Sequence, residues 1–408
     1  MKRILILGGS NCQKNAVLYG KAHGYEVIIA DSSKTPVAAL YANGLIEVST
    51  FDVAGCIQAA AEYNVDGVMT MGTDQPVLTA ALVADALHLP STLGPVEAKS
   101  VTNKKIMKAI FTENAIPSVN YRLIHAASTL NEIKDISAPL VLKPLDSQGQ
   151  RGVFRLDDKK LVPQYLQQTL SFSREKEALL EEYYPSDEIT VSGWIHETNL
   201  TILTITDRIL LNDPLHIGIC TSHIFPSIHM NRYMEIKEIC KKIVKAFDLK
   251  NGPLYIQLLV GEKGIMVNEV AARIGGAFED VIIPRISGFD VLDSVMRASL
   301  GMEVDVTPLM DYDCSKSSVE ASVQLMFCDQ GVISEITPIE ELLKIEHVIN
   351  AGYNYQPGDE IKSIENATAR FGHCVLVSDS GPIKASIDQF QRKIQILDEK
   401  GNNLYKVL

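Results

Sequence analysis

The first ninety residues alternate short apolar runs with helical patterns. Residues 4–7 (Ile-Leu-Ile-Leu) are apolar throughout, a glycine-rich turn follows at 8–11, and a helix is expected to extend to Ala22. Further apolar runs lie at 26–30 and 67–70, again with helical patterns between them. Strands that are apolar along their whole length and alternate with helices predict a parallel sheet that is covered on both faces.

The turn after the first of these strands lacks the glycine pattern of dinucleotide-binding proteins. That pattern is Gly-x-Gly-x-x-Gly, and here Cys12 and Gln13 stand where its later glycine should be. An oxidoreductase that binds a dinucleotide is therefore disfavoured.

Length and composition limit the other classes of function. A chain of 408 residues is too long for one hydrophobic core, so we expect two or three domains. The 38 basic and 50 acidic side chains give a net charge of -12, which argues against nucleic acid as a partner. The seven cysteines include no Cys-x-x-Cys pair, which disfavours a disulfide framework or a zinc site. No apolar run is long enough to span a bilayer, and we expect a cytoplasmic protein with no membrane partner.

The pattern of elements predicts three domains, of α/β and α+β class, with boundaries at 1–95, 96–310 and 311–408. The middle domain is expected to begin with one helix from Glu97 to Asn114. It then divides into a small lid subdomain at about 110–185 and a larger subdomain at 186–310. The last ninety or so residues, from Ser317, are expected to mix strands with one helix.

Two lysines and a glycine-rich loop in the middle domain suit a polyphosphate. Lys105 opens the domain, and Lys143 ends the apolar strand 140–143 just before the loop 146–153. Converging ammonium groups and backbone N–H groups in a glycine-rich loop can both bind phosphate oxygens, and Arg151 could add a charged contact. Taken alone, each lysine is better explained as a solvated surface residue, although Lys143 at the end of an apolar strand fits that interpretation less well. The loop alone is explained equally well by a β-hairpin turn.

An acidic strand end follows at residues 181–184 (Glu-Glu-Tyr-Tyr), with Glu188 four residues further on. A strand edge with one free carbonyl and one free amide can pair with the edge of adenine, and a nearby carboxylate can bind the two ribose hydroxyls. The alternative is an acidic strand end on the surface.

A β-hairpin is expected from strands at 254–260 and 265–271. A three-residue loop, with Gly264 in the left-handed conformation, would place Gln257 directly opposite Glu269 on one face. Two oxygen ligands would then point into one site, which suits Mg²⁺ bridging phosphates. A two-residue loop would put the two side chains on opposite faces. Arg273 follows the hairpin and could hold the transferring phosphoryl group.

The order of these features resembles the ATP-grasp superfamily over nearly the whole chain. The resemblance implies a Rossmann-like preATP-grasp domain, a two-subdomain ATP-grasp fold and a small mixed C-terminal domain. Within this superfamily, the chain is similar to L-amino acid ligases, purine-biosynthesis ligases, biotin carboxylase and carbamoyl phosphate synthetase-like proteins. Two positions depart from the common pattern, since Gln257 replaces a frequent Glu and Ala271 replaces a frequent Asn. The run 268–273 instead looks like the Asn-Glu-x-Ala-x-Arg arrangement of carboxyaminoimidazole ribonucleotide synthases.

By position, the resemblance assigns four groups of residues. The phosphates, adenine and ribose would be bound by Lys105, Lys143, Ser147, Gly149, Gly152, Glu181, Glu182, Tyr184, Glu188 and Asn268. The metal ligands would be Gln257 and Glu269, the catalytic residues Arg273 and Arg151, and the substrate contact His223, for which a histidine satisfied by nearby backbone is the alternative.

The activity implied is ligation of a carboxylate to an amine through an acyl phosphate, with release of ADP and phosphate. ATP and Mg²⁺ are the expected cofactors, and Mn²⁺ could replace Mg²⁺. The expected partners are a small carboxylate, such as an amino acid, and an amine; a homodimer is allowed. The alternatives are a phosphoribosylglycinamide synthetase-like purine ligase, a small-molecule kinase on the same fold, and a nucleotide-binding protein without activity. A biotin carboxylase is less attractive because no biotin-carrier segment is attached.

Overall fold

The computed structural model describes residues 1–406 and begins with a four-stranded parallel sheet of strand order β3-β2-β1-β4. Its strands are β1 (Arg3–Leu7), β2 (Glu26–Asp31), β3 (Gly44–Glu47) and β4 (Gly67–Met69). The helices of this N-terminal unit are α1 (Asn11–Ala22), α2 (Val53–Glu62), α3 (Gln75–Leu87) and α4 (Pro95–Thr102). The predicted parallel sheet is confirmed, since β1 pairs in parallel with both β2 and β4.

The single helix expected from Glu97 to Asn114 is two helices in the structure. Helix α4 ends at Thr102 and α5 spans Lys104–Glu113, with Asn103 between them in an extended conformation. The Asn103 side chain accepts hydrogen bonds from the backbone N–H groups of Lys105 and Ile106, so it caps the start of α5. This cap fixes which of the following lysines faces inward.

The lid subdomain is a four-stranded antiparallel sheet of strand order β5-β8-β6-β7. Its elements are β5 (Tyr121–His125), β6 (Leu140–Pro144), β7 (Phe154–Leu156), β8 (Glu177–Glu182) and α6 (Val162–Ser171). Buried apolar side chains from β6, β8 and α6, including Leu142, Leu166 and Leu180, form one hydrophobic cluster. The lid therefore has a core of its own.

A large eight-stranded sheet, of order β13-β12-β9-β10-β11-β14-β18-β16, runs through the centre of the molecule. Its first five strands in chain order are β9 (Asp187–His196), β10 (Asn199–Leu210), β11 (Cys220–Phe225), β12 (Gly252–Gly261) and β13 (Gly264–Ala271). The helices of this region are α7 (Tyr233–Ala246), α8 (Glu279–Ser287) and α9 (Val291–Ser299).

The C-terminal region extends the same sheet with β14 (Glu320–Met326), β16 (Val348–Tyr353) and β18 (Gly372–Ser378). It adds a small sheet of β15 (Gly331–Ile336), β17 (Glu360–Ile361) and β19 (Ile396–Asp398). Helix α11 (Lys384–Lys393) is accompanied by the short α10 (Ile339–Leu342), so there are two helices where one was expected. Since β14 pairs with β11, the proposed domain boundary at residue 310 is crossed by one continuous sheet.

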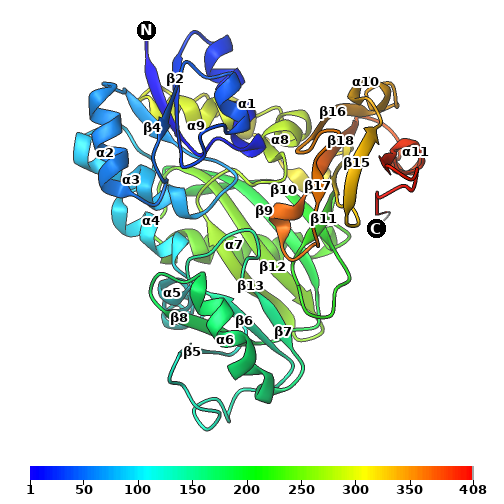
Figure 1. The fold of residues 1–408 in the computed structure, drawn as a ribbon. Helices are drawn as coiled ribbons and strands as arrows, with labels where there is room; N and C mark the ends of the chain where they lie inside the picture. The colour runs from blue at the N-terminus through cyan, green and yellow to red at the C-terminus, as the bar shows by residue number, and fades with distance from the viewer. Residues whose placement is uncertain (407–408) are drawn as a thin grey trace.

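The four parts are arranged around the central sheet (Figure 1). The N-terminal unit, in blue, and the lid, in teal, lie at opposite ends of it, and the orange C-terminal strands β16 and β18 continue it at one edge. The N-terminal unit shares a hydrophobic cluster with the central region, in which Ile4 and Met69 pack with Trp194, Phe289 and Met296. Within residues 1–406, none of the helices has both the length and the apolar character needed to cross a membrane.

Candidate active site

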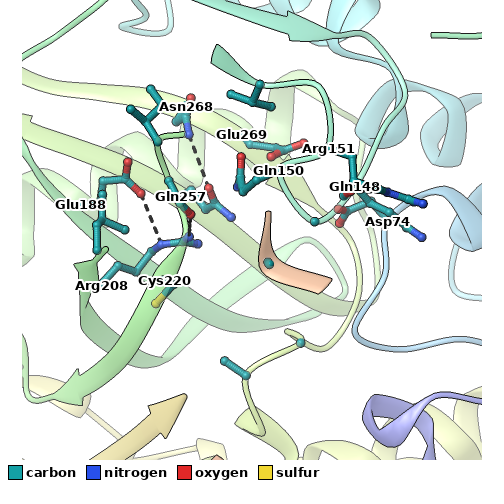
Figure 2. Close-up of a pocket in the computed structure, with 18 of the residues that line it drawn as sticks. Asp74, Gln148, Gln150, Arg151, Glu188, Arg208, Cys220, Gln257, Asn268 and Glu269 are labelled. Carbon is teal, nitrogen blue, oxygen red and sulfur yellow. Dashed lines mark hydrogen bonds and ion pairs between the residues drawn. The ribbon is translucent and has the colours of Figure 1, made fainter. Parts of the chain in front are cut away.

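One cavity of about 940 Å³ lies where the lid, the central sheet, the N-terminal unit and the C-terminal region meet (Figure 2). Every one of these parts contributes to its walls, for example through Lys143, Gln257, Asp74 and His373. Its volume is at the upper end of the range of small-molecule sites, roughly 300–1,000 Å³. The cavity is therefore large enough for a nucleotide together with a second small molecule.

At the lid side of the cavity, Lys143 and Lys104 carry the ammonium groups. Lys143, near the end of β6, donates a hydrogen bond to Oδ1 of Asn268 at 3.0 Å. Lys104 Nζ lies 2.6 Å from Oε1 of Glu269. Both lysines line the cavity and are mostly buried.

The expected phosphate contact of Lys105 is not supported, because Lys105 lies outside the cavity lining. Its ammonium group pairs with Glu177 at 2.6 Å, and its side chain is 44% exposed. Successive residues of a helix point about 100° apart, so only one of two adjacent lysines can face the cavity. The cap at Asn103 gives that position to Lys104.

Glu181 lies between two lysines. Its carboxylate pairs with Lys108 at 2.5 Å and with Lys143, and both Glu181 and Lys108 are almost fully buried. Burial alone would raise the pKa of the Glu181 carboxyl, but Lys108 and Lys143 together lower this pKa to about 2. The carboxylate is thus occupied by lysines and orients Lys143, so it is not free for the adenine contact expected of it.

The hairpin of β12 and β13 has a shorter loop than the sequence predicted. Gly261 pairs with Gly264, so the loop contains only the two residues 262–263, and the three-residue expectation is wrong. The register nevertheless shifts further along the hairpin, where Gln257 pairs with Glu269 but Leu258 pairs with Val267. Asn268 is the extra residue of this β-bulge, which restores the predicted opposition of Gln257 and Glu269.

The bulge brings three oxygen donors to one wall of the cavity (Figure 2). Asn268 lies between the other two in the chain, and its Nδ2 donates to Oε1 of Gln257 at 3.4 Å. Burial raises the pKa of the Glu269 carboxyl, and the larger combined effect of Lys104, Lys143 and Arg273 lowers it, so the carboxylate is charged. Hard oxygen donors of this kind fit Mg²⁺, which typically takes one or two carboxylates and completes its shell with phosphate oxygens and waters.

Within residues 1–406, no group of three or more His, Cys, Asp or Glu side chains is arranged to hold a metal ion. A single carboxylate with two amide oxygens would leave most of the coordination shell to a bound polyphosphate.

The glycine-rich loop joins β6 to β7, which pair as an antiparallel hairpin, and it also lines the cavity. Ser147 and Gly149 are lining residues, whereas Gly152 is not. Gly152 has a φ of +72°, and an added Cβ would lie 2.7 Å from the Phe172 ring. The glycine at 152 is therefore required by the backbone turn and by packing, and its expected direct contact with the nucleotide is not supported.

The loop reaches across the cavity to the C-terminal region. The carbonyl oxygen of Gly149 accepts a hydrogen bond from the Ala367 N–H at 3.0 Å. Arg151 lines the cavity and donates from Nε to the carbonyl oxygen of Gln148 at 3.2 Å. This bond tightens the loop.

The segment after β8 forms the wall expected to hold adenine. Glu182 and Tyr184 both line the cavity. The Glu182 carboxylate is held by Asn120 Nδ2 at 3.0 Å and by the Ser137 N–H at 2.8 Å. The Tyr184 hydroxyl donates to the carbonyl oxygen of Gly264 at 2.9 Å, which ties this wall to the hairpin loop.

Glu188, the expected ribose contact, also lies in the cavity wall but has a cationic partner. Its carboxylate is 3.3 Å from Nε of Arg208, which stands opposite it on the neighbouring strand β10 (Figure 2). Arg208 is 7% exposed. No local sequence pattern marks this arginine, because only strand pairing brings it into the site.

Arg273 is held by the N-terminal unit. Its Nε and Nη2 lie 2.8 and 2.5 Å from Oδ1 of Asp74, and its guanidinium stacks 4.5 Å from the Tyr255 ring centre. Asp74 follows the last strand of the parallel sheet, at the strand ends where such sheets bind ligands. The pair joins two parts of the chain at the cavity, and the catalytic role expected of Arg273 stays a prediction.

His223 lines the cavity but is only 3% exposed. Burial, followed by the positive charges of Arg208 and Arg370, lowers its pKa well below the ordinary value. Its Nδ1 is 3.1 Å from the hydroxyl of Thr206. His223 is thus a neutral imidazole with one side-chain partner, and its expected contact with substrate remains untested.

Comparison with known proteins agrees with this arrangement. Residues 136–280 match the model of the ATP-grasp domain, and residues 323–397 match that of the L-amino acid ligase C-terminal domain 2. The chain therefore contains an ATP-grasp domain, followed by a region similar to the C-terminal domain of L-amino acid ligases. The resemblance to ATP-grasp ligases, and the prediction of an ATP-dependent enzyme that forms a carbon–nitrogen bond, are confirmed at this level.

Individual relatives have low sequence identity to this chain, but their alignments cover most of it. Dapdiamide A synthase from Enterobacter agglomerans is 24% identical over 80% of this chain and 76% of its own. The L-arginine-specific L-amino acid ligase from Bacillus subtilis is 22% identical over 74% of each chain. The structure of an L-amino acid ligase from Bacillus licheniformis aligns with a TM-score of 0.81 at 19% identity, covering 98% of this chain and 99% of that one.

Proposed function

We propose that this ATP-grasp protein joins the carboxylate of an amino acid or small carboxylate to the amine of a second amino acid. One observation carries the proposal. The C-terminal region that matches the L-amino acid ligase domain places Asn354, Tyr355 and His373 in the same cavity as the lysines and the hairpin. A nucleotide and a second substrate would therefore share one cavity.

The chemistry has two steps. A carboxylate oxygen of the donor attacks the γ-phosphorus of ATP, and ADP leaves as the acyl phosphate forms. The amine of the acceptor then attacks the acyl carbon, phosphate leaves, and the amine gives up a proton. The protein contributes mainly by positioning the reactants and neutralising charge.

The residues of the cavity divide this work. Lys104 and Lys143 would bind the phosphates, and the loop 146–153 would cover them. Gln257, Asn268 and Glu269 would hold Mg²⁺ or Mn²⁺, which neutralises phosphate charge when bound. The segment 182–184 would hold the adenine. Arg273 would contact the transferring phosphoryl group from its position beside the hairpin.

A screen of ADP release with amino acids, singly and in pairs, tests the proposal. Dependence on two amino acids supports the ligase, and dependence on one indicates a kinase. No release with any amino acid, together with ATP binding, indicates a nucleotide-binding protein without this activity. An arm with glycine and phosphoribosylamine tests the purine-ligase alternative, and turnover only in that arm would replace the proposal.

The homodimer also stays a prediction, which sedimentation equilibrium checks.

A further inference from the structure

The second substrate end of the cavity contains an arginine whose charge is not matched by a carboxylate. Arg370 lines the cavity and lies directly after a single helical turn at Ala367–Ala369. Its Nη1 donates to the carbonyl oxygen of Gly276 at 2.9 Å. Its Nε is buried and has no hydrogen-bond partner within residues 1–406.

Two other arginines that line the cavity, Arg208 and Arg273, differ from Arg370 because each is paired with a carboxylate. Arg208 is paired with Glu188 at 3.3 Å, and Arg273 with Asp74 at 2.5 Å. No carboxylate of the described chain lies within ion-pair distance of Arg370. A buried donor without a partner costs free energy in the unbound protein, and a ligand that satisfies it recovers that cost.

The surroundings of Arg370 offer little compensating charge. Burial raises the pKa of the Glu279 carboxyl, and one oxygen of this carboxyl already accepts the Ala277 N–H at 2.7 Å. His373 stacks on Phe278 with ring centres 3.6 Å apart, and burial lowers its pKa to about 3, so it is neutral. Among the described residues, Arg370 thus lines the cavity without a carboxylate at ion-pair distance, and the buried Glu279 interacts with its charge only at longer range.

Arg370 is anchored to the turn that leaves the hairpin and to the C-terminal region. The carbonyl of Gly276 that it contacts belongs to the turn leaving the hairpin, three residues after Arg273. Its own carbonyl accepts from Asn354 Nδ2 at 2.7 Å, which fixes this backbone in the C-terminal region. Lys104 and Lys143 lie instead on the lid side, where the phosphates are expected.

We propose that Arg370 binds the carboxylate of the acceptor amino acid, the carboxylate that is not activated in the reaction. This proposal rests on the ligase function proposed above. The donor carboxylate is consumed as an acyl phosphate, whereas the acceptor carboxylate keeps its charge throughout and needs a lasting partner. A guanidinium can donate two parallel hydrogen bonds to this carboxylate, and one of them would come from the unpartnered Nε of Arg370.

The test measures the use of three acceptors by each of three enzymes: wild type, Arg370→Gln and Arg370→Lys. The donor is one that the screen of ADP release has identified. The acceptors are the amino acid, its carboxamide, and hydroxylamine, which attacks the acyl phosphate to give a hydroxamate but carries no carboxylate. Wild type should prefer the acid over the amide by on the order of 100-fold in kcat/KM, as expected for loss of a charge-assisted pair. Arg370→Gln should lose this preference, with the acid affected far more than hydroxylamine.

Exposed Lys362 provides a matched control for the loss of one positive charge in the same region. Lys362→Gln should keep the preference for the acid, and melting temperatures of all variants identify any that fail to fold. Equal use of acid and amide by wild type would overturn the proposal without any variant. Equal losses with the acid and with hydroxylamine in Arg370→Gln would assign the residue to the acyl phosphate instead. Absence of hydroxamate in wild type would contradict the ligase function itself.

Discussion

The adjacent lysines at the start of α5 provide the most direct test of the site. Lys104 contacts Glu269 inside the cavity at 2.6 Å, while Lys105 contacts Glu177 outside it at the same distance. We predict that Lys104→Met impairs ATP use and that Lys105→Met does not. The two substitutions are chemically identical and differ only in the direction of the side chain, so each is the control for the other.

The expected size follows from the surroundings of Lys104. Its side chain is 14% exposed, and a charged hydrogen bond in such a place typically contributes about 1.5–3 kcal/mol. Since 1.4 kcal/mol corresponds to a factor of ten, Lys104→Met should lower kcat/KM for ATP by roughly 10- to 100-fold. Lys105 is far more exposed, and its substitution should change kcat/KM for ATP less than about threefold.

The assay is ADP release at varied ATP with saturating substrates, combined with the melting temperature of each variant without nucleotide. The melting temperature is needed because Glu269 loses a partner in Lys104→Met and this loss can reduce stability by itself. A large defect in Lys105→Met with a normal Lys104→Met would refute the assignment. Equal defects in both would show that the helix start, rather than one ammonium group, determines ATP use.

Four further outcomes are expected. Titration with Mg-ATP should raise the midpoint temperature of one thermal unfolding transition. The stabilisation should be about 2.7 kcal/mol when the ligand concentration is one hundred times Kd, and Mg-NAD⁺ should cause no such shift. Glu269→Ala should abolish turnover but leave measurable nucleotide affinity, and Gln257→Ala should be milder; the reverse order in ADP release would contradict the ligand assignment. Arg273→Lys should lower ADP release by about 100-fold while the charge opposite Asp74 keeps the melting temperature nearly unchanged, and full turnover would exclude a catalytic role. Because the pKa of Glu181 is lowered from 4.5 to about 2, its ionisation should stabilise the fold above pH 4.5, and this stabilisation should be lost as pH falls toward 2. Urea unfolding from pH 2 to 7 should therefore show a weaker acid dependence for Glu181→Gln than for wild type.

The order of site residues along the chain could be predicted because each lies at a recognisable point of a local element. Lys143 ends an apolar strand, Glu269 follows a hairpin turn, and the loop 146–153 contains the glycines that tight turns require. These are short-range patterns of burial and backbone conformation. They fix which segments approach the cavity, and all of these segments do contribute to its walls.

The direction of individual side chains needed information that the patterns do not contain. The choice between Lys104 and Lys105 depends on the cap at Asn103, and the prediction of one uninterrupted helix concealed that cap. Lys108 resembles an ordinary helix residue, and its burial against Glu181 becomes visible only when the lid sheet packs on α5. Arg370 comes from a region without nucleotide motifs, so no local pattern marks it.

The hairpin shows how a correct pairing can follow from a wrong local model. A loop of two residues, 262–263, would place Gln257 and Glu269 on opposite faces of a regular ladder, because a slip of one residue exchanges the faces. The bulge at Asn268 adds one residue to one strand only and restores the pairing. A regular hairpin with a three-residue loop would have aligned the same two side chains, but Asn268 would then have pointed to the opposite face. The bulge thus brings a third oxygen donor to the cavity wall, where Asn268 contacts both Lys143 and Gln257. Since irregular ladders are costly unless they serve packing or a site, this bulge is better explained by the grouping of donors than by the turn.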